Sequence, residues 1–102
     1  MGLGEQETSG VLGALSNATR RWVVDELDAR DRQSLFELHT RLIEKYGLAQ
    51  SRQGFSRHLA TLEEAGIIEV EWSGSTKLHS LNRAPIQALL VGWLRKFEES
   101  SE

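Results

Sequence analysis

The chain contains no cysteine and a single proline in 102 residues. Without cysteine it has no disulfide, no thiolate nucleophile and no thiolate ligand for a metal. No apolar run approaches the length that crosses a bilayer, and the opening MGLGEQETSG lacks the basic start and apolar core of a secretory signal. We therefore expect a cytoplasmic protein that has no membrane-bound part.

An excess of positive charge is also absent. The formal net charge is -3, which argues mildly against a nucleic-acid partner because phosphate contacts require Lys and Arg. Five of the 15 acidic residues lie in the two termini, however, and 15 − 5 leaves 10 acidic groups against 12 basic ones over residues 11–97. The body of the chain is therefore close to neutral, which permits DNA binding without indicating it.

The length of the chain predicts one small domain. A core built from 102 residues is thin, so a partner subunit that covers more apolar surface would stabilise it. Residues 1–10 are polar and contain glycine, and we expect a flexible N-terminal segment there. The domain then covers residues 11–99 and begins with VLGAL at residues 11–15, an apolar piece of one or two helical turns.

Two helices are marked by their capping residues. Ser16 and Asn17 are placed to cap a helix over ATRRWVVDELDA. Ser34 and Glu37 have the spacing of a capping box, in which each side chain satisfies a free backbone N–H of the other residue. The helix that they open ends at Gly47, which is typical of a left-handed cap.

The next helix, from Ser51 to Gly66, has two distinct faces. Its apolar residues recur at i, i+4 and i+7, a stripe that packs on the body of a protein. The residues of this stripe are Phe55, Leu59 and Leu62. Gln53, Arg57 and Ala60 lie on the other side, so we expect a polar surface there that faces outward.

A β-hairpin and a last helix complete the domain. IIEVEW and TKLHSL are strand-like runs on either side of SGS, which is typical of a tight turn. Pro85 is tolerated in the first turn of a helix over PIQALLVGWLRKF. Three helices followed by a two-stranded wing form the winged helix-turn-helix arrangement. We therefore predict a mainly α fold with a small β-hairpin, whose third helix of the trio enters the DNA major groove.

Three blocks of sequence carry a family resemblance. ALSNATRRWVVDEL, SRHLATLEEAGII and KLHSLN occur in this order within residues 12–97. Together they resemble the ArsR-like bacterial transcriptional regulators, the family of the arsenical-resistance repressors. The resemblance implies a winged-helix homodimer that binds double-stranded DNA and regulates transcription.

A recognition helix of this kind reads bases with its outward face. We predict that Gln53 pairs with adenine and Arg57 with guanine, the bases to which these side chains make bidentate contacts. Gly54 would let the backbone approach a DNA strand closely. Arg20 and Lys77 are further candidates for contacts to DNA. The flanking residues, which are placed for phosphates beside the positive helix N-terminus, are Ser51, Arg52, Ser56 and His58.

Each of these assignments has a simpler alternative. Gln53 and Arg57 alternatively form a solvated helix face. His58 alternatively makes only a local hydrogen bond, and Arg20 alternatively stays hydrated. Lys77 on the wing has two glutamates nearby, at positions 69 and 71, which repel phosphate. We expect the wing to contribute a weak contact at most.

A broad apolar stripe on the last helix predicts a homodimer. Its residues recur every three and four positions over three turns, more than a lone terminal helix needs on so small a body. Packed with VLGAL against a two-fold mate, it would hold two recognition helices about 34 Å apart, as an imperfect palindrome requires. The residues assigned to this interface are Leu12, Leu15, Ile86, Leu89, Leu90, Trp93, Leu94 and Phe97.

Many members of the resembled family bind metal through Cys or through Asp/His pairs on the last helix. This chain has no cysteine, its last helix contains neither His nor Asp, and its three histidines lie on separate predicted elements. We therefore expect no metal and no other cofactor. The alternatives for a signal are a small organic effector beside the aromatic last helix, or none.

Three classes of function follow. A homodimeric DNA-binding transcriptional regulator, a repressor that acts by occupying its site, is favoured. A winged-helix protein–protein interaction module without DNA binding is the alternative, because the wing is acidic and the body near neutral. An enzyme is the weakest, since no pattern pairs a nucleophile with a base and no Gly-rich phosphate loop is present.

Overall fold

The chain folds into helices with one β-hairpin near the C-terminal end. The computed structural model describes residues 3–99. Its elements are α1 (Glu5–Ala14), α2 (Ala18–Ala29), α3 (Leu35–Tyr46), α4 (Arg52–Glu64), β1 (Ile68–Ser73), β2 (Thr76–Leu81), α5 (Ala84–Val91) and a 3₁₀ helix η1 (Trp93–Phe97). The predicted mainly α fold with a small hairpin is confirmed. Within residues 3–99, no helix has both the length and the apolar character that crossing a membrane requires.

Of the two residues predicted to cap α2, Asn17 is the cap, whereas the Ser16 hydroxyl donates instead to the Gly13 carbonyl at 2.6 Å. Asn17 Oδ1 accepts a hydrogen bond from the backbone N–H of Arg20 at 3.2 Å. The capping box is complete, because the Glu37 N–H donates to Ser34 Oγ at 3.1 Å and the Ser34 N–H donates to Glu37 Oε1 at 2.9 Å. Gly47 ends α3 with φ 69°, a left-handed conformation that glycine adopts without strain. Local hydrogen bonds therefore fix these helix ends.

The N-terminal segment differs from the prediction. Residues 1–10 were expected to be flexible, whereas α1 begins at Glu5 and runs through VLGAL to Ala14. The Gly4 N–H donates to Glu7 Oε1 at 2.9 Å, which satisfies a free backbone donor at the helix start. Val11 and Ala14 are buried against the rest of the chain, and this tertiary packing stabilises a helix whose polar first half gives no local signal.

The last helix is also different from the prediction. The single helix expected from Pro85 to Phe97 is broken at Gly92, where φ is -96° and ψ is -115°. Beyond the break the chain continues as η1, in which the rings of Trp93 and Phe97 meet edge to face at 5.0 Å. Glycine takes this non-helical conformation easily because it has no Cβ. The apolar residues around the break therefore do not form one straight stripe.

The β-hairpin is tied to the turn between α2 and α3. β1 and β2 pair antiparallel along their whole length, around a turn in which Gly74 has φ 62°. The backbones of Gln33 and His79 exchange two hydrogen bonds, of 3.0 and 2.8 Å. The buried side chain of His79 adds a bond from Nδ1 to the Gln33 carbonyl at 2.8 Å. These bonds hold the base of the wing on the helical body.

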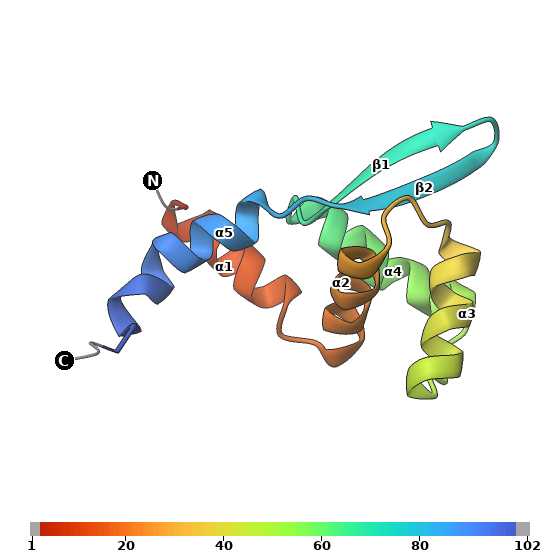
Figure 1. Ribbon diagram of the computed structural model, residues 1–102, viewed down its shortest axis with the longest axis horizontal. Helices are drawn as coiled ribbons and strands as arrows, with labels where there is room; N and C mark the ends of the chain where they lie inside the picture. The colour runs from red at the N-terminus through yellow and green to blue at the C-terminus, as the bar shows by residue number, and fades with distance from the viewer. Residues whose placement is uncertain (1–2, 100–102) are drawn as a thin grey trace.

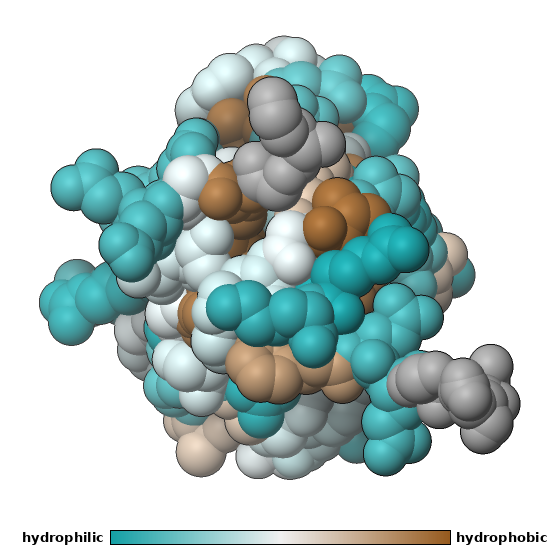
Figure 2. Space-filling model, turned by 90° about the vertical axis from the view of Figure 1, so that its left-hand side faces the viewer, coloured by the Kyte–Doolittle hydropathy of each residue, from teal (hydrophilic) through white to brown (hydrophobic). Residues whose placement is uncertain are grey.

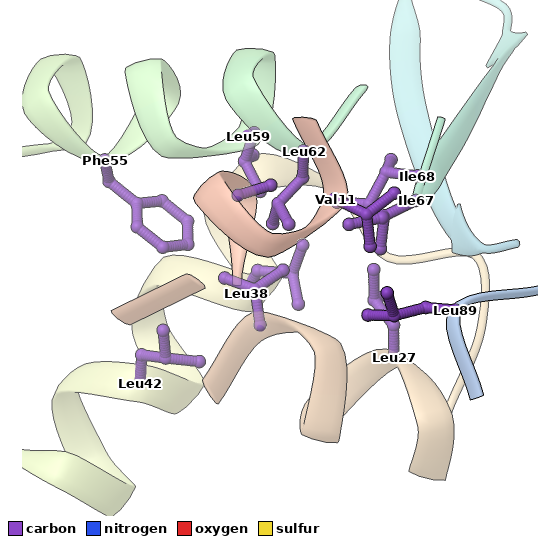
Figure 3. Packing of buried hydrophobic residues seen from close by; sticks show 12 residues of the cluster. Val11, Leu27, Leu38, Leu42, Phe55, Leu59, Leu62, Ile67, Ile68 and Leu89 are labelled. Atoms are coloured by element: carbon purple, nitrogen blue, oxygen red, sulfur yellow. The ribbon is translucent and has the colours of Figure 1, made fainter. Parts of the chain in front are cut away.

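One apolar core joins the helices to the base of the wing (Figure 3). In that view the side chains of Phe55, Leu59 and Leu62 point from α4 into the space between the neighbouring helices. Each buried Leu or Phe contributes about 1.5–3 kcal/mol relative to an exposed side chain. The core consists of Val11, Ala14, Val23, Leu27, Leu38, Leu42, Phe55, Leu59, Leu62, Ile67, Ile68 and Leu89.

Two parts of the molecule lie at opposite ends of its long axis (Figure 1). α2, α3 and α4 pack together beneath the hairpin, while α1 and α5 lie side by side as an arm that carries both chain ends. The molecule measures 48 × 28 × 22 Å along its principal axes. We call α1, α5 and η1 the terminal arm. It leaves apolar surface uncovered, as described below.

Candidate nucleic-acid interface

Helix α4 is fixed to the body by one side only. Phe55, Leu59 and Leu62 are at most 4% exposed, as the apolar stripe predicts. The side chains of Gln53, Arg57 and Ala60 are exposed on the other side. Among residues 3–99 the Arg57 guanidinium takes part in no ion pair. On this side the helix therefore presents the Gln53 amide and the Arg57 guanidinium to solvent, which confirms the predicted orientation.

The N-terminus of α4 has its own cap and a positioned arginine. Ser51 Oγ accepts from the Gly54 N–H at 3.2 Å, so this hydroxyl is engaged in capping. The guanidinium carbon of Arg52 lies 5.8 Å from the ring centre of Phe36 on α3, a cation–π geometry. Phe36 is 61% exposed. The contact links the first residue of α4 to α3.

Gly54 is not required by the fold. A Cβ built at this position would lie 3.7 Å from Ser51 Oγ and 4.0 Å from Gln50 Cβ, which are ordinary contact distances. The backbone there is helical, so alanine would fit without strain. Glycine in a helix costs about 0.5–1 kcal/mol relative to alanine. Nothing within the protomer explains that cost.

The side of α4 that faces the wing is partly covered. Ser56 is half-buried and lines a hollow beneath the wing together with Lys77 and His79. The Lys77 ammonium lies 3.6 Å from a carboxylate oxygen of Glu63 on α4. Glu71, which the sequence places near the wing tip, pairs instead with Arg32 at 3.0 Å. Both charges near the wing are therefore partly neutralised by contacts to the helical body.

His58 and Arg20 contact each other. The Arg20 Nη1 group lies 3.0 Å from His58 Nδ1, and Arg20 also donates to the carbonyls of Ala14 and Gly13 at 2.7 and 3.2 Å. The local hydrogen bond that was the alternative for His58 is therefore present. The Arg20 guanidinium is bonded to protein groups, unlike the simply hydrated side chain that was its alternative. No local pattern indicates this contact, because the two residues are 38 positions apart. Whether either residue also touches DNA stays a prediction.

The terminal arm exposes apolar side chains (Figure 2). This end of the molecule shows brown apolar patches between polar ones. A hollow of about 440 Å³ between α1 and η1 is lined partly by Leu12 and Trp93. Leu89 is 3% exposed and belongs to the protomer's own core, and Leu15, Ile86 and Leu94 are partly buried against it. The exposed apolar residues of the arm are Leu12, Leu90, Val91, Trp93 and Phe97.

These features together define a class of protein. A helix-turn-helix pair, a half-exposed second helix with Gln and Arg on its free face, and an adjoining β-wing form a winged helix-turn-helix DNA-binding domain. Comparison with known sequences agrees, because a family model described as "Helix-turn-helix domain" matches residues 15–71. The chain belongs to the ArsR-like branch of the helix-turn-helix transcriptional regulators, and DNA binding is implied by that membership.

Several relatives support this assignment. The chain is 39% identical over 84 residues to the uncharacterized HTH-type transcriptional regulator YuzN of Bacillus subtilis (strain 168), covering 82% of this chain and 91% of that protein. An ArsR-like transcriptional regulator from Rhodococcus sp. RHA1 superposes with a TM-score of 0.73 at 29% identity, over 90% of this chain and 80% of its own. A crystal structure of another ArsR family regulator has a TM-score of 0.78 over 95% and 92% of the two chains. At 23% identity, the latter shows likeness of fold alone.

Proposed function

We propose that the protein is a homodimeric transcriptional repressor that binds an imperfect DNA palindrome through α4 and does not sense a metal. The observation that carries this proposal is the orientation of α4, buried along Phe55, Leu59 and Leu62 and exposed at Gln53 and Arg57. Gln and Arg are side chains that read adenine and guanine in the major groove. The positive end of the helix dipole and Arg52 would meet the phosphates beside them.

Dimerisation is supported by the exposed side of the terminal arm. Leu90, Trp93 and Phe97 are 56%, 47% and 62% exposed, and burial against a second copy would remove this apolar surface from water. A two-fold interface at the arm would repeat α4 on either side of the axis, so that the dimer reads a palindrome. Leu89 is left out of the proposed interface because it is already buried within the protomer.

A DNA-binding titration tests the central claim. The protein is titrated onto a labelled duplex from upstream of its own coding sequence, at several salt concentrations, with an unrelated duplex as reference. Specific binding that weakens steeply with salt supports the proposal. Arg57→Ala should lower specific affinity about five- to 100-fold, as expected for loss of one bidentate base contact. Arg83→Ala is the matched control, because it removes the same charge from an arginine paired with Asp28.

Gly54→Ala separates DNA contact from folding. Since a Cβ fits at this position, the variant should be as stable as the parent or more so by up to about 1 kcal/mol. If the α4 backbone approaches a DNA strand, the same variant should bind the specific duplex more weakly. Equal affinity would remove Gly54 from the interface. Binding to neither duplex by the parent protein would instead favour an interaction module that does not use DNA.

Repression is supported by mechanism and by one relative. A dimer on promoter DNA blocks polymerase by occupancy, and the transcriptional repressor BigR from Xylella fastidiosa has a similar structure, with a TM-score of 0.60 and 26% identity. In vitro transcription from the upstream region, with and without the protein, tests the sign of regulation. Increased transcript would show an activator and contradict this part of the proposal.

The claim that no metal is sensed rests on the side chains available. The chain has no cysteine. His39, His58 and His79 lie on α3, α4 and β2, and each already takes part in a hydrogen bond. Addition of Zn²⁺ or a chelator should therefore leave specific DNA affinity unchanged. A shift larger than about threefold would identify a metal-responsive protein, since allosteric effectors change affinity by roughly five-fold or more.

A further inference from the structure

Arg20 connects three helices through its guanidinium. From the first turn of α2 it donates to the carbonyls of Gly13 and Ala14 at the C-terminal end of α1, at 3.2 and 2.7 Å. Its Nη1 group points at His58 Nδ1 on α4, 3.0 Å away. Those two carbonyls belong to the last turn of α1, and the Gly13 carbonyl also accepts from the N–H and the hydroxyl of Ser16, at 3.2 and 2.6 Å. The terminal arm is thereby joined to the recognition helix through one side chain.

The hydrogen bond from Arg20 determines which ring nitrogen of His58 carries the hydrogen. A guanidinium has only donors, so His58 Nδ1 must be an unprotonated acceptor and the neutral ring carries its hydrogen on Nε2. His58 Nε2 lies 3.2 Å from the side-chain nitrogen of Gln50. Two N–H donors do not bond each other, so the tautomer that Arg20 requires also requires the opposite flip of the Gln50 amide, which puts its oxygen in that place as the acceptor. Gln50 precedes the cap of α4, and its backbone carbonyl takes a 2.8 Å bond from His39 Nε2 on α3. We call the hydrogen bonds that join the α1 carbonyls, Arg20, His58 and Gln50 the relay. It therefore extends from the terminal arm to the turn that precedes α4.

His58 differs from the other two histidines in this respect. His39 and His79 each direct a ring nitrogen at a backbone carbonyl, and that nitrogen keeps its hydrogen when the ring is protonated. His58 instead accepts from a permanent cation. A second proton on His58 would remove the lone pair that Arg20 uses and would place two positive charges side by side.

We propose that neutral His58 is a positioning residue for DNA binding, which accepts from Arg20 to hold α4 and the α3–α4 turn in register with the terminal arm, and that its protonation breaks this coupling. The inference rests on the proposed DNA-binding function. His58 acts through the placement of α4, not through a contact to DNA, so its effect is opposite in sign to that of a phosphate-binding histidine.

The surroundings of His58 favour its neutral form. Of the groups that face it, Arg20 from α2 carries a charge, whereas Gln50 and the α1 carbonyls behind Arg20 do not. Burial and, second, the positive charge of Arg20 lower the pKa of His58 below its usual value of 6.5. The relay is therefore intact near neutral pH and opens on acidification.

The sign of the pH dependence tests the proposal. Affinity for a duplex from upstream of the coding sequence is measured at intervals from about pH 7.5 down to the lowest pH at which circular dichroism shows a folded protein, because the lowered pKa of His58 places its protonation below the usual range of histidine. His58→Gln is the matched variant, because its amide oxygen accepts from Arg20 and does not titrate. Relative to this variant, the parent should lose roughly five- to twentyfold in affinity on acidification, the range of a typical coupling between sites. His58→Ala should already be weakened at the highest pH.

Other outcomes are equally informative. If acidification raises the affinity of the parent relative to that of His58→Gln, protonated His58 contacts phosphate and the relay is refuted. If the two proteins show the same pH dependence, the coupling is absent. Arg20→Lys, which keeps the charge but not the three-way geometry, should resemble His58→Ala; parent-like affinity would contradict the relay.

A measurement without DNA separates the relay from the proposed function. Nitrogen-15 NMR of the free protein should show His58 as the Nε2–H tautomer, and its protonation should occur at higher pH in Arg20→Gln. If no DNA binds at any pH, the proposed function fails while this test still applies. The Nδ1–H tautomer in the parent protein would overturn the relay even if DNA binding is found.

Discussion

The indole of Trp22 in α2 lies flat on the phenol ring of Tyr46 in α3, with ring centres 4.5 Å apart and planes 2° from parallel. The two side chains are half-buried, and the stack joins the first turns of α2 to the last turn of α3. Lys45 extends over the Tyr46 ring at 5.6 Å and reaches a carboxylate oxygen of Glu26 at 2.8 Å. The helix pair that supports α4 is therefore held together by aromatic and charged contacts as well as by the core.

Removal of one ring should loosen this helix pair. Tyr46→Ala is expected to lower the free energy of unfolding by about 1–3 kcal/mol, because a half-buried ring and its stacking energy are lost. Tyr46→Phe keeps the ring and should stay within about 0.5 kcal/mol of the parent. Urea unfolding followed by Trp fluorescence measures both variants. Equal effects of the two changes would show that the hydroxyl, not the stack, matters.

A charge on the exposed side of α5 should produce monomers. Leu90→Glu places a carboxylate on a side chain that is 56% exposed in the protomer and would be buried in the proposed dimer, where an unpaired charge is costly. DNA binding should be lost with dimerisation. Gln87→Glu makes the same charge change at another exposed position of α5 and should remain dimeric. Sedimentation velocity decides, and a dimeric Leu90→Glu would place the interface elsewhere.

The stability of the fold should fall on acidification because of His79. Burial, as the largest cause, lowers the pKa of His79 below its usual 6.5, and nearby Lys77 acts in the same direction, while the bond to Gln33 and the charge of Glu63 oppose them. A lowered pKa means that the unfolded chain takes up the proton first. The contribution of neutral His79 to the free energy of unfolding is therefore fully present above pH 6.5. It is lost as the pH falls from there through the lower pKa of His79 in the folded state.

Unfolding free energies measured at intervals between neutral and acidic pH test this expectation. The slope attributable to one histidine is at most about 1.4 kcal/mol per pH unit. His79→Gln should remove its share of the slope, although it also costs stability at every pH because the bond to the Gln33 carbonyl is altered. An unchanged slope in His79→Gln would mean that His79 takes up no extra proton on unfolding. His58, whose pKa is also lowered, accounts for part of the remaining slope.

In the described part of the chain, Arg32 is the one residue other than glycine that has a positive φ, at 61°. Its side chain pairs with Glu71 on the wing, but both groups are more than half exposed, so the pair is worth about 0–1 kcal/mol. Arg32→Asn should stay within about 0.5 kcal/mol of the parent, because Asn tolerates the left-handed region. Arg32→Val should cost about 1–2 kcal/mol through backbone strain. Thermal unfolding measures the difference, and a harmless valine would show that the turn relaxes.

Local signals predicted much of the fold and the orientation of α4. The caps at Asn17, Ser34 and Ser51 are side chains that bond to backbone N–H groups three residues away. The inward stripe of α4 follows from residues three and four positions apart. Such interactions depend on neighbours along the chain, so the sequence is sufficient to indicate them.

Features that depend on contacts between distant segments were decided by tertiary packing. α1 begins at Glu5 because Val11 and Ala14 pack into the core. Leu89 points inward and Leu90 points outward because α5 packs on α1 and then ends at Gly92. The sequence determined which segments become helix or strand and which side of α4 is apolar, since those preferences are set within a few residues. The contact of Arg20 with His58, the stack of Trp22 on Tyr46 and the anchoring of the wing arise only when distant segments meet. The residue pattern within one segment does not specify which distant segment it will pack against.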